Sequence, residues 1–231
     1  MNVTDRSGLA QRLRWVPARW RCLPRVVRAV LSTVLVLALV SAALTARLLV
    51  LPAQGMPSRV SAIVMLSGPG VRLPVALQLA DEHQAPVLVV SQGHDGYGSP
   101  CPPRPPGVQL ICFDPDPATT RGEAEYIGRL AKKYHWTSVV VVTSRPQATR
   151  ARMLVERCFP GAVYNATGPL PMRSWPYEIA YGWGALLKAL LVVRTCLPAG
   201  PDSWANRPSA QHCPDSVVEC FPVGGHQADH R

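Results

Sequence analysis

The chain has 231 residues, of which 48% are hydrophobic and 16% charged, and its formal net charge is +10. This length suits one sizeable domain with extensions. Residues 1–28 carry seven arginines against one acid, which gives +6 of the +10 directly before an apolar run. Because the rest of the chain is only mildly basic, the charge does not indicate a nucleic-acid-binding protein.

The apolar run begins at residue 29, contains no charged residue up to Ala46, and continues past Arg47 to Leu51. A helix of about 20 apolar residues crosses a bilayer core, so 29–51 is expected to be a single transmembrane signal anchor. The basic segment 1–28 should remain in the cytoplasm, which places the main domain outside the cell membrane. A cleaved signal peptide is the alternative, although a basic segment of this length is unusual for one.

Six of the seven cysteines follow the apolar run, at Cys101, Cys112, Cys158, Cys196, Cys213 and Cys220. An even number on the oxidising side permits three disulfides, and the sequence does not choose their pairing. The alternative is that Cys112 and Cys158 are buried thiols on apolar faces. No Cys/His spacing resembles a zinc site, so no metal is predicted.

After a linker at 52–57, strand and helix signals alternate. Apolar runs predict five strands, at 59–66, 85–91, 108–113, 137–143 and 161–165. Helical spacing follows the other strands, but 92–107, between the second and third, is a Gly/Pro-rich loop that cannot hold a regular element. A last apolar helix is expected from Tyr177 to Val193. Continuous apolar strands, each followed by a helix, are typical of parallel sheets covered on both faces.

We therefore expect an α/β fold, with a Rossmann-like, doubly wound parallel sheet of about five strands, over residues 58–195. The remainder, 196–231, is rich in Pro, Gly, Ser and His and shows no periodicity. We expect this tail to be disordered, with a local Cys213–Cys220 bridge as one way to restrain it.

Ligands of open parallel sheets bind outside the carboxyl ends of the strands, so the loops there supply the candidate residues. The first loop contains Ser67, Gly68, Gly70 and Arg72, whose glycines would let main-chain amides approach an anion. Leu73 stands where a dinucleotide fingerprint has its third glycine. A tight turn without a ligand is the equally weighted alternative. Ser91, which ends the second strand, is a further ligand-binding candidate.

The second loop contains Thr119, Thr120, Arg121 and Glu123. Thr120 and Glu123 have the spacing of a capping box, in which each side chain bonds the other's main-chain amide. The other hypothesis has the residues of this loop facing a ligand, and the two are not exclusive.

The third loop follows the four-valine strand with Thr143, Ser144 and Gln147, and Ser144 and Gln147 form a second S-x-x-Q capping pattern. One turn further on, Arg150 is the best candidate for an anion clamp. A surface ion pair of about 0–1 kcal/mol is its alternative role.

These motifs, in the order AIVMLSGPG, VLVVSQG, TTRGEA and VVVVTSRPQATRARML behind one membrane helix, resemble the YdcF/SanA/ElyC family over about 60–193. By position, Gly68 and Gly70 match the family's glycine-rich turn. Thr120, Glu123 and Ala124 match its T-x-E-N-A-like helix start, with Glu123 at the asparagine position. Thr143, Ser144, Arg150 and Ala151 match V-T-S-x-x-H-x-x-R-A.

Gln147 stands where the family usually has histidine. A glutamine cannot exchange protons near neutral pH, so this chain would lack any acid–base step that the histidine performs. The resemblance implies a Rossmann-like envelope protein linked to peptidoglycan or lipid-carrier metabolism. Within that family, one soluble relative binds S-adenosylmethionine. The sequence names no cofactor for this chain.

The leading hypothesis is a membrane-anchored exported domain that binds an anionic, phosphate-bearing envelope metabolite or lipid-linked precursor. An enzyme, either a hydrolase or a transferase with Glu123 as the base and Ser144 as a polar positioner, is the first alternative. A non-catalytic structural envelope module is the second.

Overall fold

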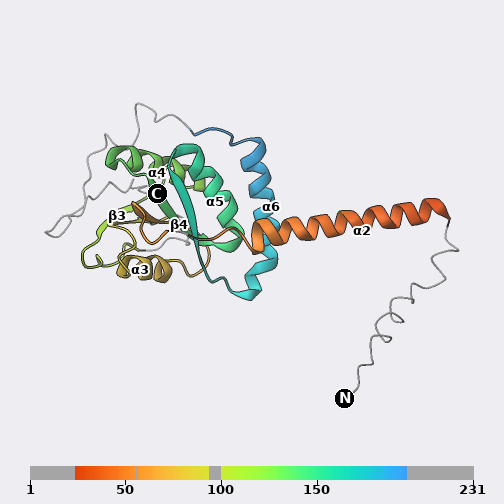
Figure 1. Cartoon of the computed structure of the whole chain (residues 1–231), viewed down its shortest axis with the longest axis horizontal. Coiled ribbons are helices and arrows are strands. Elements are labelled where there is room, and N and C mark those ends of the chain that lie inside the picture. The colour runs from red at the N-terminus through yellow and green to blue at the C-terminus, as the bar shows by residue number, and fades with distance from the viewer. Residues whose placement is uncertain (1–23, 56, 94–99, 197–231) are drawn as a thin grey trace, which may run out of the picture. The chain divides into compact units, whose positions relative to one another are not determined.

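The computed structural model describes residues 24–55, 57–93 and 100–196. The basic segment before residue 24, the predicted tail after Cys196 and the cysteines at 22, 213 and 220 lie outside these ranges. The chain divides into two compact units, Met1–Thr45 and Ala46–Arg231. Helices and strands carry the labels of Figure 1.

The first unit contains α2 (Arg25–Thr45), which continues into a π-helical turn, η2 (Ala46–Val50). Together they form the one helix in the described residues that is long and apolar enough to cross a membrane. The compact second unit includes η2, and Leu49 is only 1% exposed within it. The packed domain therefore begins at Ala46, whereas the sequence suggested a linker up to residue 57.

Within the described residues, the second unit after η2 is an α/β domain built on five strands and four α-helices. In chain order these are β1 (Ala62–Met65), α3 (Leu73–Asp81), β2 (Val87–Ser91), β3 (Gln109–Phe113), α4 (Thr120–Tyr134), β4 (Ser138–Ser144), α5 (Arg145–Cys158), β5 (Ala162–Gly168), the short 3-10 turn η3 (Met172–Ser174) and α6 (Trp175–Leu191). The strands pair in parallel in the order β3-β2-β1-β4-β5. The predicted Rossmann-like parallel sheet is confirmed.

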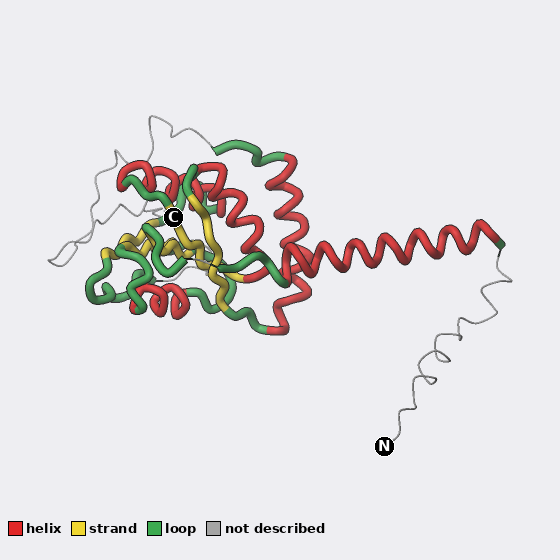
Figure 2. The backbone as a smooth tube through the Cα atoms, viewed as in Figure 1, coloured by secondary structure: helices red, strands yellow, loops and turns green. Residues whose placement is uncertain are grey.

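Helices cover both faces of the sheet, as Figures 1 and 2 show, and the three central strands β2, β1 and β4 are therefore buried almost throughout. Alternate residues of β4 enter different cores: Val139 and Val141 pack on the α4–α5 side, and Val140 and Val142 on the α3 side. β-branched residues suit such strands because they pack well on a pleated surface. The continuous valine run therefore reflects burial on both faces.

The described part of the second unit contains two disulfides, Cys101–Cys112 and Cys158–Cys196. They rule out the alternative in which Cys112 and Cys158 are free buried thiols. Disulfides persist in oxidising compartments, which agrees with an extracytoplasmic location for this unit.

Candidate functional site

The strand order reverses between β1 and β4, which are central neighbours in the sheet. From β1 the chain proceeds outward to β2 and β3, and from β4 it proceeds the other way to β5. The carboxyl ends of two such strands form the usual ligand crevice of an open α/β sheet. The loops after β1 and β4 therefore define the candidate site.

The loop after β1 folds around the side chain of Arg72. Gly68 and Gly70 have φ values of 122° and 103°, in the region that favours glycine. A Cβ on Gly68 would lie 2.8 Å from an Arg72 guanidinium nitrogen. Glycine is therefore needed there both for its conformation and for the space that the guanidinium occupies.

Arg72 uses its whole guanidinium group inside the protein. Its Nε donates to Pro69 O (3.1 Å), and Nη1 donates to Leu66 O (2.9 Å) and to Ser67 O. Nη2 reaches the start of α5, where it donates to Ser144 Oγ (3.3 Å) and Gln147 Oε1 (3.1 Å).

A guanidinium has five N–H groups, and each of these bonds uses one. Arg72 therefore ties β1 to α5, and in this conformation no donor is left for a ligand.

Burial makes this arrangement costly for the charge of Arg72, which is 3% exposed. Desolvation lowers the pKa of Arg72 to about 10, while the carboxylates of Glu123 and Glu178 counteract the shift and Arg150 adds to it. Because a pKa of about 10 lies well above neutral pH, Arg72 stays protonated there. Glu123 and Glu178 favour its charge, and Arg150 disfavours it.

Glu123 is the buried carboxyl of the site. Its Oε1 accepts from Ser67 N (2.7 Å) and Ser67 Oγ (2.8 Å), which joins α4 to the β1 loop. Burial raises the pKa of Glu123, against the opposing effects of Ser91, Ser67 and Arg72. The Ser91 hydroxyl acts at close range without forming a hydrogen bond of regular geometry.

Neither predicted capping box forms. The N-cap of α4 is Thr119, whose Oγ1 accepts from Gly122 N at 3.3 Å, while Glu123 turns to Ser67. Ser144 does occupy the N-cap position of α5, but its side chain makes no capping bond. Instead, the Ser144 hydroxyl and the Gln147 side-chain oxygen both accept hydrogen bonds from Arg72. A capping pattern in the sequence does not reveal such a competing partner, because Arg72 is distant along the chain.

Glu178 is the residue that the sequence analysis missed. It lies in the first turn of α6, is buried, and accepts from Gln147 Nε2 at 3.5 Å. The only signal in the sequence is a lone acid in an otherwise apolar helix. Gln147 thus accepts from Arg72 and donates to Glu178, so one amide links β1, α5 and α6.

Arg150 is half-buried one turn into α5. Its guanidinium lies over the Tyr181 ring at 5.6 Å and forms no hydrogen bond or ion pair with any described residue. It is also close enough to Arg72 to lower that residue's pKa. Arg150 is therefore the cation at the site whose donors are available.

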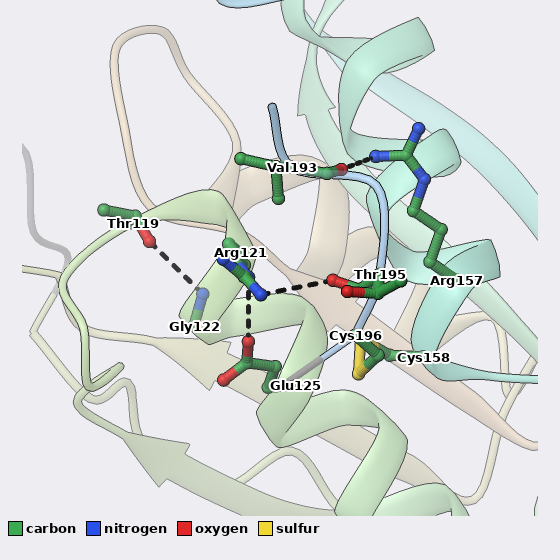
Figure 3. A network of polar contacts seen from close by, with 9 residues as sticks. All are labelled: Thr119, Arg121, Gly122, Glu125, Arg157, Cys158, Val193, Thr195 and Cys196. Carbon is green, nitrogen blue, oxygen red and sulfur yellow. Dashed lines mark hydrogen bonds and ion pairs between the residues drawn. A yellow bond between two sulfur atoms is a disulfide. The ribbon is translucent and has the colours of Figure 1, made fainter. Parts of the chain in front are cut away.

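Arg121 belongs to a different cluster. Figure 3 shows its guanidinium between Glu125, at 3.2 Å, and the main-chain oxygen of Thr195, at 3.2 Å. This cluster, together with the Cys158–Cys196 disulfide, fastens the segment after α6 onto α4 and α5. Arg121 thus has a structural role here, and Thr120 beside it is half-buried in the first turn of α4.

Two buried hydroxyls at strand ends have no hydrogen-bond partner within the described residues: Ser91 Oγ at the end of β2 and Thr143 Oγ1 near the end of β4. Buried hydroxyls normally have a partner. The Ser91 hydroxyl lies close to Glu123 and opposes the rise of its pKa, and both hydroxyls are fully buried. Among the described residues, no group of three or more His, Cys, Asp or Glu side chains could hold a metal ion.

Two hollows lie elsewhere on the domain. One of about 270 Å³ includes Arg47, Arg152 and Asn165, and one of about 500 Å³ at the amino edge of the sheet includes Arg59 and Trp136. Neither is lined by the residues that surround Arg72. Comparisons with protein-family models, curated proteins and solved structures gave no match, so geometry and charge alone carry the functional argument.

Proposed function

We propose that the protein is a membrane-anchored, exported domain of the YdcF/SanA/ElyC type that binds an anionic, phosphate-bearing envelope metabolite or lipid carrier. The binding site in this proposal is the edge of the sheet between β1 and β4. The observation that carries it is Arg150, a half-buried cation beside the Arg72 cluster with no hydrogen bond or ion pair to any described residue.

Charge favours an anion at this position. The pKa of Arg72 is lowered mainly by burial, and Arg150 adds a smaller repulsion between the two cations. An anion bound beside Arg150 would offset that repulsion. Charge-assisted bonds from Arg150 to phosphate oxygens contribute about 1.5–3 kcal/mol each.

The roles differ from those suggested by the sequence pattern alone. Arg150 contacts the ligand in this proposal, whereas the hydroxyls of Ser91 and Thr143 are fully buried. The role of Gly68, Gly70 and Arg72 is structural, because they hold the β1 loop against the start of α5. Arg72 is then a positioning residue for the site and makes no direct contact with phosphate.

The binding test is thermal unfolding of the full chain in detergent with a short-chain polyprenyl phosphate or with inorganic phosphate. A ligand at 100 times its Kd stabilises the folded state by about 2.7 kcal/mol, which raises Tm by roughly 5–10 °C. Arg150→Ala should abolish this shift, and Arg152→Ala, on the exposed side of α5, should keep it. An unchanged shift in Arg150→Ala contradicts the proposal. A shift with inorganic phosphate alone identifies a soluble anion as the ligand class.

The second candidate is an enzyme, favoured by the burial of Glu123 and the raised pKa that burial causes, because burial is how enzymes raise the pKa of a catalytic carboxyl. Ser144 would then position the substrate. Turnover of a phosphorylated precursor should disappear in Glu123→Gln, and Gln147→His should raise it. If no variant alters binding or turnover while deletion of 52–231 gives an envelope defect, a non-catalytic structural module is the function.

The membrane topology has its own test. The apolar helix and the disulfides favour an anchor with the second unit outside the cytoplasm. A phosphatase reporter fused after Leu51 should be active, and a cytoplasmic reporter at the same point should be inactive. The reverse result rules out the proposed orientation.

A further inference from the structure

The helix α6 is apolar on its exposed side as well as on its buried side. Its only charged residues are Glu178, which is buried, and Lys188. The exposed side carries Tyr177 (67% exposed), Leu187 (49%) and Leu191 (65%). A helix that is hydrophobic all round is normally enclosed by protein or by a membrane, so this face lacks the covering that its composition requires.

The other face of α6 is fully used within the domain. Glu178, Gly182, Leu186 and Ala189 are its buried residues, and α6 packs against α5. A methyl group added at Gly182 would lie 3.3 Å from Leu49 Cδ2, so the middle of α6 contacts the η2 turn.

The contact with η2 keeps α6 close, along the chain, to the end of the apolar run. Leu49 follows Ala46, the last residue of the uncharged apolar run, by three residues, and three residues of chain span at most about 11 Å. If the apolar run crosses the membrane, Gly182 is therefore tethered within a short distance of the outer headgroups.

The charges around the exposed face suit a lipid surface. Arg173 precedes α6, Lys188 lies within it and Arg194 follows it, and all three are exposed. Between Met172 and Arg194 the only acid is Glu178, which is buried. Basic residues beside an apolar face attract anionic lipids, and tyrosine favours the membrane–water interface.

We propose that α6 lies in the outer headgroup layer of the membrane, with Tyr177, Leu187 and Leu191 directed toward the acyl chains. The domain is then held on the bilayer by two elements, the anchor helix and α6. This inference rests on the membrane anchoring in the proposed function, but not on the identity of the bound anion.

This placement also narrows the ligand class of the candidate site. Tyr181 is 48% exposed on α6 and carries the guanidinium of Arg150 over its ring at 5.6 Å. The available cation of the site is therefore one side chain away from the surface that faces lipid. An amphiphile with its phosphate at headgroup level can reach Arg150 without leaving the bilayer.

The test is photo-crosslinking of the full chain in vesicles of phosphatidylethanolamine and phosphatidylglycerol. The photoreactive residue p-benzoylphenylalanine is placed at Leu187, or at the exposed Lys132 of α4 as the matched control. Lipid adducts, measured by mass spectrometry, should be about tenfold more abundant at Leu187, because of the two labelled helices only α6 contacts acyl chains in this proposal.

Equal lipid adducts at the two positions, or adducts of Leu187 with a second copy of the chain or with residues 197–231, overturn the proposal. The reporter after Leu51 and the Arg150→Ala binding test separate the possible failures. If the reporter after Leu51 shows the domain outside the cytoplasm and lipid adducts show no excess at Leu187, only the role of α6 is refuted. If the reporter shows the domain inside the cytoplasm, the membrane topology on which both proposals depend is refuted. If only anion binding is absent, the proposal for α6 still stands.

Discussion

The Arg72 network leads to a quantitative prediction for Arg72→Met. The substitution keeps much of the side-chain volume but leaves five acceptors without their donor, of which three are main-chain oxygens of the β1 loop. Each unsatisfied buried acceptor costs about 1–3 kcal/mol. Burial lowers the pKa of Arg72 to about 10, which corresponds to about 3 kcal/mol, and this is the relief gained when the buried charge is removed.

The lost hydrogen bonds outweigh this relief, so we expect Arg72→Met to reduce the free energy of unfolding by about 3–5 kcal/mol, the usual range for breaking a buried charge network. Urea unfolding of the full chain in detergent, followed by tryptophan fluorescence, measures it. Arg152→Met is the control, because Arg152 and its partner Glu156 are both more than 40% exposed and such pairs contribute about 0–1 kcal/mol. A loss of under about 1 kcal/mol in Arg72→Met would refute the idea that this side chain joins β1 to α5.

Three further predictions concern other parts of the domain. Because the folded pKa of Glu123 lies above its ordinary value of 4.5, wild type should lose stability relative to Glu123→Gln as pH rises from 4.5 toward that folded pKa; urea midpoints that run parallel across this range contradict it. Gly122→Ala would place a Cβ 2.0 Å from a main-chain oxygen of the loop before α4, and should lower Tm by several degrees. Gly184→Ala, with open space around it, should raise helix stability by up to about 1 kcal/mol; equal effects would show that the close approach at Gly122 is not limiting. Removing the Cys158–Cys196 disulfide, which closes a separation of 38 residues, should cost about 4 kcal/mol in urea unfolding, and an unchanged midpoint would contradict that value.

The sheet could be predicted from the sequence because its determinants are local. The run Val139–Val142 is apolar at every position, which is typical of a strand buried on both faces. Short runs of this kind, each followed by helical spacing, also imply parallel order. The strand limits were less accurate: the first strand was expected at 59–66 and spans Ala62–Met65.

The hydrogen-bond network of the site could not be predicted, because the residues that bond each other are far apart in the sequence. Glu123 bonds Ser67 across 56 positions, and Arg72 bonds Gln147 across 75. A capping pattern describes only what a side chain can do within its own helix turn. The partner from α6, Glu178, has no motif at all and could be recognised only once the fold had brought α6 to α5.

Gln147 lies at a position where glutamine and histidine can be exchanged by one nucleotide change. Its amide accepts a hydrogen bond at one end and donates one at the other, from Arg72 and to Glu178. A neutral imidazole also offers one acceptor and one donor, so either residue can maintain the same connection. Glutamine and histidine codons differ only in their third base. A single nucleotide change at this position is therefore enough to give or remove a titratable group between a buried arginine and a buried glutamate.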